Sequence, residues 1–203
     1  MGFYREQIVP RVTNRALNGR PFDRLRARAT LGLEGEVLEI GFGSGRNVPH
    51  YPATVTRVRA VEPSVVGRKL AAGRVAACPV PVEYIGLDGQ ELPVGDACID
   101  HVLTTWTLCT IPDVVRALRE VHRVLKPSGM LHFVEHGRAP DSRVARWQDR
   151  LTPIQRRVAS GCHLNRPIDE LVAASGLVIE RLDHPEVPGP RTFTYMYEGV
   201  ARR

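Results

Sequence analysis

The stretch of the chain that decides its fold, residues 37–47, reads VLEIGFGSGRN. An apolar run leads into three glycines at alternate positions, Gly41, Gly43 and Gly45. Glycine lets a chain turn sharply and lets the backbone approach a ligand closely. The spacing G-x-G-x-G is one residue shorter than the dinucleotide fingerprint, and it lacks the lysine of a phosphate-binding loop. The stretch therefore predicts a strand and a tight turn, which either holds a ligand or only connects two elements.

Strand-like and helix-like patterns alternate along the rest of the chain. They predict strands at 36–41, 55–62, 82–86, 98–106 and 130–136, and helices at 64–76, 112–126, 142–159 and 166–176. Pro112 opens the clearest helix, and the sequence KPSG ends it. Two further strands, at 177–184 and 192–201, follow each other without a helix between them. We expect an α/β fold, a doubly wound Rossmann-like sheet of about seven strands, mostly parallel with an antiparallel edge hairpin.

Length and composition indicate one ordinary globular domain over residues 1–203. Hydrophobic residues make up 43% of the chain and charged residues 25%, as in soluble proteins generally. The net charge is +6, but the arginines are scattered and aromatic residues reach only 6%, so we expect no nucleic-acid partner. No run approaches the roughly 18 apolar residues of a membrane span, and the first residues lack the apolar centre of a signal peptide. We expect a cytoplasmic protein of unknown oligomeric state.

The cysteines predict reduced thiols. They form no CxxC pair and no small disulfide scaffold; the four are Cys78, Cys98, Cys109 and Cys162. Cys98 has the character of a core residue. The spacing of Cys109 and Cys162 relative to His136 and His163 does not indicate a metal or redox site, and we expect no metal.

Acidic residues follow the second and third predicted strands. Glu62 ends the second strand, and its carboxylate could accept hydrogen bonds from both ribose hydroxyls of an adenosine. Asp88 follows the third strand and could accept from an adenine amino group, with the Gly89 amide facing the ring. Each carboxylate alone is commonly a solvated loop residue. Because the ends of parallel strands share one edge, the glycine turn and both carboxylates together predict an adenosyl site.

With these features the sequence resembles the class I S-adenosylmethionine-dependent methyltransferases. The resemblance covers residues 34 to 136 as an ordered set: EVLEIGFGSG, VEP, GLDGQELP, IDHVLTTWTLCTIPD and ALREVHRVLKPSGMLHFVEH. The part REVHRVLKPSGMLHFVE is similar to the type 11 methyltransferase domain. The resemblance implies a methyltransferase whose cofactor is S-adenosylmethionine. Phe42 stands where this family commonly has Cys or Ala, a departure inside the glycine turn.

The resemblance also implies which residues hold the cofactor. Glu39 and Gly41 would lie near its amino-acid part, Glu62 at the ribose, and Asp88 with Gly89 at the adenine. The implied cofactor-binding residues are Tyr4, Glu39, Gly41, Gly43, Gly45, Asn47, Glu62, Pro63, Asp88, Gly89, Thr104 and Thr105. Residues 1–33 would form a helical lid, interrupted at Pro10, over a core of 34–203 with a helical cap at 137–175.

A finer resemblance suggests the methyl acceptor. TLCTI after the fourth strand, VEH at the end of the fifth, and GCHLNR at 161–166 are similar to the thiol S-methyltransferases of the methyltransferase-like seven group. The implied acceptor is a small thiol. Animal members begin with an apolar membrane-anchoring helix that this sequence lacks, so peripheral membrane contact stays open. The alternatives are an O- or C-methyltransferase of a quinol or phenol-like metabolite and a non-catalytic S-adenosylmethionine-binding protein. The glycine spacing disfavours a dinucleotide reductase.

The catalytic candidates lie at the end of the fifth strand and beyond. Methyl transfer is an in-line displacement that needs an aligned nucleophile, either a thiolate or an oxygen with a general base. His136 is placed for either task, or it is a loop histidine bonded to backbone. His163 is the second candidate, and Glu135 could orient a histidine or close the site. Trp106 could line the acceptor site or belong to the core. We expect structural roles for the other strand and helix histidines, which are His101, His122 and His132.

Overall fold

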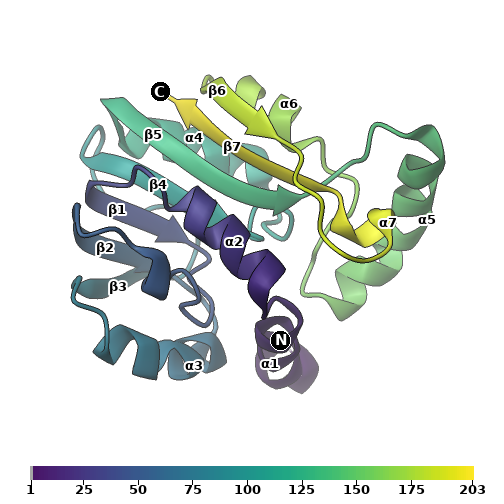
Figure 1. Cartoon of the computed structure of the whole chain (residues 1–203), viewed down its shortest axis with the longest axis horizontal. Helices are drawn as coiled ribbons and strands as arrows, with labels where there is room; N and C mark the ends of the chain where they lie inside the picture. Colours follow the sequence, from purple (N-terminus) through teal and green to yellow (C-terminus); the bar gives the residue numbers. More distant parts are fainter. Residues whose placement is uncertain (1) are drawn as a thin grey trace.

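The computed structural model describes residues 2–203 as a seven-stranded sheet with helices around it (Figure 1). The strands are β1 (Gly35–Ile40), β2 (Val55–Val61), β3 (Val82–Gly86), β4 (Ile99–Thr105), β5 (Leu125–His136), β6 (Val178–Asp183) and β7 (Met196–Arg202). Their order is β3-β2-β1-β4-β5-β7-β6, and β7 runs antiparallel to both of its neighbours. The predicted Rossmann-like sheet with an antiparallel hairpin at one edge is therefore confirmed.

The helical segments connect these strands. They are η1 (Tyr4–Ile8), α1 (Val9–Ala16), α2 (Arg20–Ala29), η2 (Val48–His50), α3 (Val65–Ala76), α4 (Val114–Val124), α5 (Ser142–Val158), α6 (Ile168–Ala174) and α7 (Arg191–Thr194). Figure 1 shows α2 crossing the near face of the sheet, with α4 and α6 behind it. α1, α5 and α7 lie around the carboxyl ends of β1, β4 and β5.

Both faces of the sheet are buried, which explains the nearly continuous apolar character of the central strands. In β4, Val102 packs into the core cluster that contains α4 and α6, whereas Leu103 packs into the cluster that contains α2 and α3. In β1, Leu38 and Val37 divide between the same two clusters. All four side chains are fully buried. Each contributes roughly 1.5–3 kcal/mol of hydrophobic stabilisation.

The helix α4 begins later and ends earlier than its sequence indicates. Its N-cap is Asp113, whose carboxylate accepts a hydrogen bond from the Arg116 amide at 3.0 Å, so Pro112 lies just outside the helix. Its last residue is Val124, and β5 starts at the next residue. The expectation that KPSG ends the helix is wrong. These residues lie within β5, where the β4–β5 register shifts between Ile99 and His101, and the Lys126 ammonium binds Asp100 at 2.6 Å.

The last strand also begins later than predicted. Residues 191–194 form the short helix α7, and β7 starts at Met196. Pro190 precedes α7, and its carbonyl accepts a hydrogen bond from the Thr194 hydroxyl at 3.2 Å. This local bond favours a helical turn, which overrides the β propensity of the aromatic and threonine residues there.

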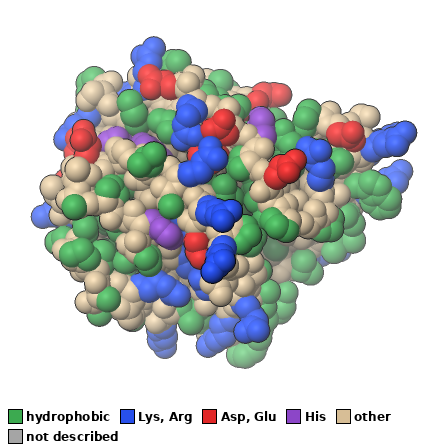
Figure 2. Space-filling view, viewed as in Figure 1, with side chains coloured by type: hydrophobic (Ala, Val, Ile, Leu, Met, Phe, Trp, Pro, Cys, Tyr) green, Lys and Arg blue, Asp and Glu red, His purple; other side chains and the backbone are tan. Residues whose placement is uncertain are grey.

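One face of the molecule carries charges of both signs (Figure 2). On the face in Figure 2, lysine and arginine side chains are dispersed among acidic and apolar ones. Across residues 2–203, every helix is too short or too polar to cross a membrane.

Candidate active site

The three glycines of the turn after β1 all adopt left-handed backbone conformations. Their φ angles are +77° at Gly41, +56° at Gly43 and +70° at Gly45, which other residues adopt only at a cost. At Gly41 a Cβ atom would lie 2.0 Å from the Thr107 Oγ1 atom, so the turn is packed tightly there. At Gly43 the nearest atom to a Cβ would be 3.8 Å away, so the backbone is open. A ligand can therefore approach the backbone of the turn at Gly43 but not at Gly41.

Glu62 fixes the open part of this turn. Its carboxylate accepts hydrogen bonds from the Gly43 amide at 2.5 Å and from the Ser64 amide at 2.7 Å. Burial raises the pKa of Glu62, while these two amides oppose the rise. Each carboxylate oxygen keeps a further lone pair, so Glu62 can still accept bonds from a ligand's hydroxyls. Pro63, the next residue, is exposed.

Glu39 anchors a second polar network under the turn. The Asn47 side-chain amide donates to Glu39 and to the Thr105 hydroxyl, each at 2.9 Å, and the Tyr51 hydroxyl donates to the other Glu39 oxygen. Burial raises the pKa of Glu39 to about 7, against the opposing effect of the Tyr51 and Asn47 bonds. The network joins the ends of β1 and β4. Tyr51 was missed in the sequence because no motif marks it.

Asp88 and Gly89 lie after β3, as the sequence order requires. Asp88 is exposed and accepts from the Gln90 amide at 2.8 Å, whereas Gly89 is buried. A Cβ at Gly89 would lie 2.6 Å from a methyl group of Ile40, so only glycine fits. A surface hollow of about 370 Å³, lined by residues 85–88 and 91–93, adjoins this loop.

The N-terminal segment contacts both sides of the carboxyl edge of the sheet. In α1, the Asn14 side-chain oxygen accepts from the Ser44 hydroxyl at 2.8 Å and from Arg46 at 2.9 Å. In η1, the Tyr4 hydroxyl donates to the Val158 carbonyl at the end of α5, at 3.0 Å. The structure thus places Tyr4 against α5, and it attaches α1 to the glycine turn.

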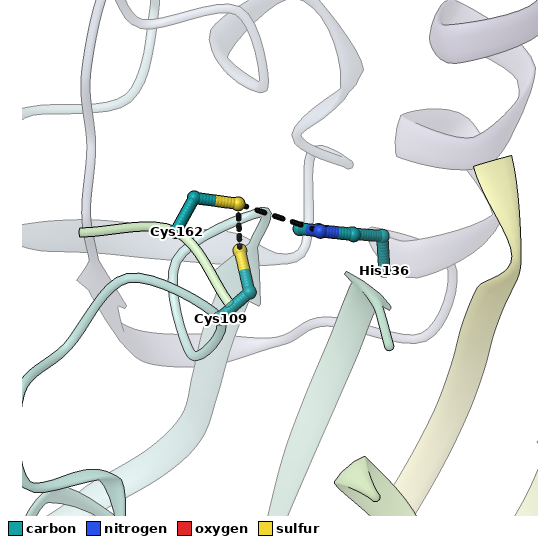
Figure 3. Close-up of side chains that lie close together, drawn as sticks. All are labelled: Cys109, His136 and Cys162. Carbon is teal, nitrogen blue, oxygen red and sulfur yellow. Dashed lines mark hydrogen bonds between the residues drawn. The ribbon is translucent and has the colours of Figure 1, made fainter. Parts of the chain in front are cut away.

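Three buried side chains meet on the other side of this edge, at the ends of β4, β5 and α5 (Figure 3). The Cys162 sulfur lies 3.8 Å from the Cys109 sulfur and 3.4 Å from the Nε2 atom of His136. Cys109 follows β4, His136 ends β5 and Cys162 follows α5. Because the three residues lie far apart in the chain, their spacing does not predict this cluster. Of the three, His136 is a predicted site residue.

Glu135 and His163 hold the loop that carries Cys109. The Glu135 carboxylate accepts from the backbone amides of Thr107 at 2.9 Å, Leu108 at 3.0 Å and Cys109 at 3.3 Å. The His163 amide donates to the Cys109 carbonyl at 2.8 Å, and its Nδ1 atom lies 3.2 Å from the same oxygen. Burial raises the pKa of Glu135, and the three amides oppose the rise. In this arrangement both residues contact loop backbone, and neither contacts the His136 ring.

The electrostatics of the cluster favour a thiolate at Cys162. The contact with Cys109 lowers the pKa of Cys162 to about 4, assisted by His136 and opposed by burial. For His136, burial works to lower the pKa, but the contact with Cys162 outweighs it and the pKa is raised. The contact with Cys162 and burial raise the pKa of Cys109 well above its ordinary value. The three groups together can therefore stabilise a sulfur anion or bind a soft cation.

The remaining histidine and tryptophan candidates lie in the sheet and at its edge. His101 and His132 face each other within β4 and β5, with ring nitrogens 3.1 Å apart, and His132 also contacts the Ala29 carbonyl. Trp106 directly follows β4 with a φ of +51°. The Arg26 guanidinium lies 4.8 Å from the centre of its ring, so Trp106 lies between the sheet edge and α2.

The chain is similar to known methyltransferases. Residues 38–133 match the methyltransferase domain family. Thiol S-methyltransferase TMT1B of Rattus norvegicus is 33% identical over 151 residues, which are 71% of this chain and 61% of the rat protein. Demethylmenaquinone methyltransferase of Lysinibacillus sphaericus is 37% identical over 67 residues, 32% of this chain and 29% of that protein. The chain thus spans less than two thirds of the length of either relative.

Solved structures agree on the fold. A chain of the complex between the Haloferax volcanii Trm112 methyltransferase activator and a methyltransferase superposes with a TM-score of 0.73 at 16% identity. The superposition covers 98% of this chain and 96% of that one. Residues 38–133 of the chain thus match a methyltransferase domain, and such a domain implies S-adenosylmethionine as the cofactor.

The residues at the glycine turn fit this cofactor. Three buried polar atoms near the ends of β1 and β4 have no partner within residues 2–203: Asn47 Oδ1, Thr104 Oγ1 and Trp106 Nε1. Buried polar atoms normally have hydrogen-bond partners, so these are available to a ligand. An acceptor, a hydroxyl and a donor complement the ammonium and carboxylate groups of the cofactor's amino-acid end. The open backbone at Gly43 adds room for a close approach.

Proposed function

We propose that the protein transfers the methyl group of S-adenosylmethionine to a small thiol. The observation that carries this proposal is the extent of the similarity. The match to the rat thiol S-methyltransferase covers 151 residues and so extends beyond the methyltransferase domain at 38–133. The match to the demethylmenaquinone methyltransferase covers 67 residues, fewer than that domain contains. The match to the thiol relative therefore includes segments outside the methyltransferase domain.

In this proposal, one side of the carboxyl edge binds the cofactor and the other side binds the acceptor. Glu62 and the Glu39–Asn47 network bind and orient the cofactor, whose sulfonium supplies an electrophilic methyl group. The cluster of Cys109, His136 and Cys162 receives the acceptor and favours its thiolate form. Glu135 positions the loop of Cys109 through the three backbone amides that it binds. Alignment of the thiolate behind the methyl group then provides most of the rate enhancement.

The proposed acceptor is tested with labelled S-adenosylmethionine and a panel of small thiols, phenols and quinols, with each product identified by mass. We expect methylated thiols only. Methylation of oxygen or carbon alone would contradict the thiol acceptor and leave the cofactor site intact. Measurable cofactor binding without any transfer would favour the non-catalytic binding protein.

A His136→Ala variant tests the division of the site. We expect kcat for a thiol to fall roughly 100-fold, because a group that acts on the acceptor's proton or charge contributes that much. The dissociation constant for S-adenosylmethionine, measured by calorimetry, should change by less than about twofold. His122→Ala, on α4 away from this edge, is the control. Equal turnover in wild type and His136→Ala would give His136 a structural role.

We also propose that the chain forms one domain in which residues 1–33 act as a lid and residues 137–175 as a cap. The bonds from Asn14 to the glycine turn and from Tyr4 to α5 support this role. Deletion of residues 2–12 should weaken cofactor binding and slow transfer in the same assays. Unchanged affinity and rate in the deletion variant would contradict the lid.

A further inference from the structure

Cys109, His136 and Cys162 have the composition of a metal site. Their ligand atoms, two sulfurs and an imidazole nitrogen, all lie within 4.8 Å of one another, and all three residues are buried. Two cysteines and one histidine are a ligand set of zinc enzymes that keep a fourth position open for a reactant. The spacing of these residues does not predict a metal site, because the sequence patterns of such sites place pairs of ligands a few residues apart.

Two of the three distances between the donors match those of a tetrahedral centre. With zinc–sulfur bonds of about 2.3 Å and zinc–nitrogen bonds of about 2.0–2.1 Å, tetrahedral angles place two sulfurs ~3.8 Å apart and a sulfur and nitrogen ~3.6 Å apart. The observed separations are 3.8 Å between the two sulfurs and 3.4 Å between the Cys162 sulfur and His136 Nε2. The Cys109 sulfur and the imidazole nitrogen lie within 4.8 Å of each other, so the three donors are close enough to share one ion.

The loops that carry the two sulfurs are held together by backbone bonds. The Cys109 carbonyl accepts from the His163 amide, and the Cys109 amide donates to Glu135. The Arg166 guanidinium donates to the Leu108 carbonyl and joins the same two loops. The donors are thus positioned by bonds that do not involve their own side chains, as a preorganised ligand set requires.

The imidazole of His136 has few other partners. It is 6% exposed, and among residues 2–203 its hydrogen-bond contacts are with the Cys162 sulfur alone. A buried ring nitrogen with only a sulfur for a partner is poorly satisfied. Two thiolates would neutralise a divalent cation in this enclosed place, and the ring nitrogen would complete a three-ligand site.

We propose that Cys109, His136 and Cys162 bind one zinc ion, and that the acceptor thiol takes its fourth coordination position. This second part rests on the proposed function. Among residues 2–203, the group of histidine, cysteine and carboxylate side chains that could hold an ion here consists of these three. His163 and Glu135, their neighbours in the chain, are engaged with backbone groups of the Cys109 loop. The proposed fourth ligand is therefore a molecule from outside the described residues.

Coordination to zinc would hold the acceptor as a thiolate, which is the form that attacks the methyl group. A thiol bound to zinc loses its proton, which passes to solvent, and stays a thiolate at neutral pH. A sulfur–carbon bond then forms between this thiolate and the methyl group as the sulfonium's own carbon–sulfur bond breaks. The electron pair of that broken bond remains on the departing thioether sulfur, so the transfer needs no oxidant or reductant.

Titration of the metal-free, reduced protein with Co²⁺ tests the site without an activity assay. We expect one equivalent to give thiolate-to-cobalt charge-transfer bands and the visible bands of a tetrahedral ion, with Zn²⁺ displacing it. Cys162→Ser and Cys109→Ser should bind at least about tenfold more weakly. Cys98→Ser, whose sulfur contacts the Gly95 carbonyl outside the cluster, should bind as the wild type does. X-ray absorption of the zinc-loaded wild type should show two protein sulfur ligands, and a third after addition of an alkyl thiol.

The outcomes separate the two proposals. Absence of cobalt–thiolate bands in the wild type, or bands of full strength in both cluster variants, would overturn the metal site. If the cluster variants do not fold, the number of sulfur ligands that X-ray absorption finds in the zinc-loaded wild type tests the site. Fewer than two sulfur ligands would contradict it. Thiol methylation by a protein that binds no metal would leave the proposed function standing. Metal binding without a third sulfur on thiol addition would remove the proposed acceptor position.

Discussion

Two regions share the carboxyl edge of the sheet and differ in their chemistry. The half that we propose for the cofactor, called the cofactor half, comprises Glu39, residues 41–47 and Glu62, and it offers carboxylates, amides and the open backbone at Gly43. The half that we propose for the acceptor, called the acceptor half, comprises Cys109, His136 and Cys162, and it consists of sulfur and imidazole. The first would recognise a polar molecule through many hydrogen bonds, whereas the second presents a few soft donors among buried side chains. The proposed transfer to a thiol needs both, because a large polar donor meets a small polarisable acceptor.

The two halves approach each other where Gly41 packs against Thr107. Thr107 belongs to the loop that Glu135 holds and that carries Cys109. A substitution at this contact should therefore affect both halves, whereas a substitution elsewhere should affect only one of them.

The largest effect should follow from Gly41→Ala. The φ of +77° and the close contact with Thr107 each oppose a side chain there. A strained backbone costs about 1–3 kcal/mol and overpacking a similar amount, so the free energy of unfolding should fall by about 2–6 kcal/mol. Denaturant unfolding measures this loss. Gly43→Ala, where space is open, is the matched control and should lose only about 1–2 kcal/mol. Equal losses would show that the halves do not meet at Gly41.

The free energy of unfolding should depend on pH through Glu39, a residue of the cofactor half. The pKa of Glu39 is about 7 in the folded protein and 4.5 as the ordinary value, so the folded state binds more protons between these limits. Stability contributed by the protonated form is therefore lost as pH rises through this window. Compared with wild type, Glu39→Gln should gain on the order of 3 kcal/mol in relative stability between pH 4.5 and pH 8. A difference in unfolding free energy that is flat with pH would contradict the raised pKa.

Glu62→Ala should damage the cofactor half alone. Removal of the carboxylate leaves the Gly43 and Ser64 amides without their partner and removes an acceptor for the ribose hydroxyls. Hydrogen bonds to a charged group contribute about 1.5–3 kcal/mol, so affinity for S-adenosylmethionine should fall by about 100-fold. Calorimetric titration measures the affinity, and Glu62→Gln should lose less because one acceptor oxygen remains. Unchanged affinity in Glu62→Ala would argue against the whole placement of the cofactor.

The smallest effect should come from the contact between the N-terminal segment and the glycine turn. Asn14→Ala removes the acceptor of the Ser44 and Arg46 bonds, each worth roughly 0.5–1.5 kcal/mol. Cofactor affinity should fall by about fivefold, with thermal stability nearly unchanged. Asn18→Ala, which removes one exposed bond to Arg46, should have almost no effect. If the two variants behave alike, α1 does not contribute to the cofactor half.

The two halves also differ in how far the sequence reveals them. The glycine turn and Glu62 lie within one strand–turn–strand unit, where spacing along the chain fixes position in space. Pattern and resemblance were enough to propose them. Tyr51 and Thr107 were missed because their contacts depend on side-chain packing and leave no spacing signal. Asp88 and Gly89 were placed at the right strand end, although the exposure of one and the burial of the other needed the structure.

By itself the sequence determined the alternating strands and helices and the α/β sheet, because apolar periodicity is a local property of the chain. The class of enzyme and the cofactor were predicted from the resemblance of its motifs to a known family. Only the tertiary structure decided that Cys109, His136 and Cys162 converge. Each belongs to a different element, and the parallel sheet brings the carboxyl ends of β4 and β5 to one edge, where the loop after α5 packs against them. Contacts of this kind depend on how elements pack, and residue spacing does not record them.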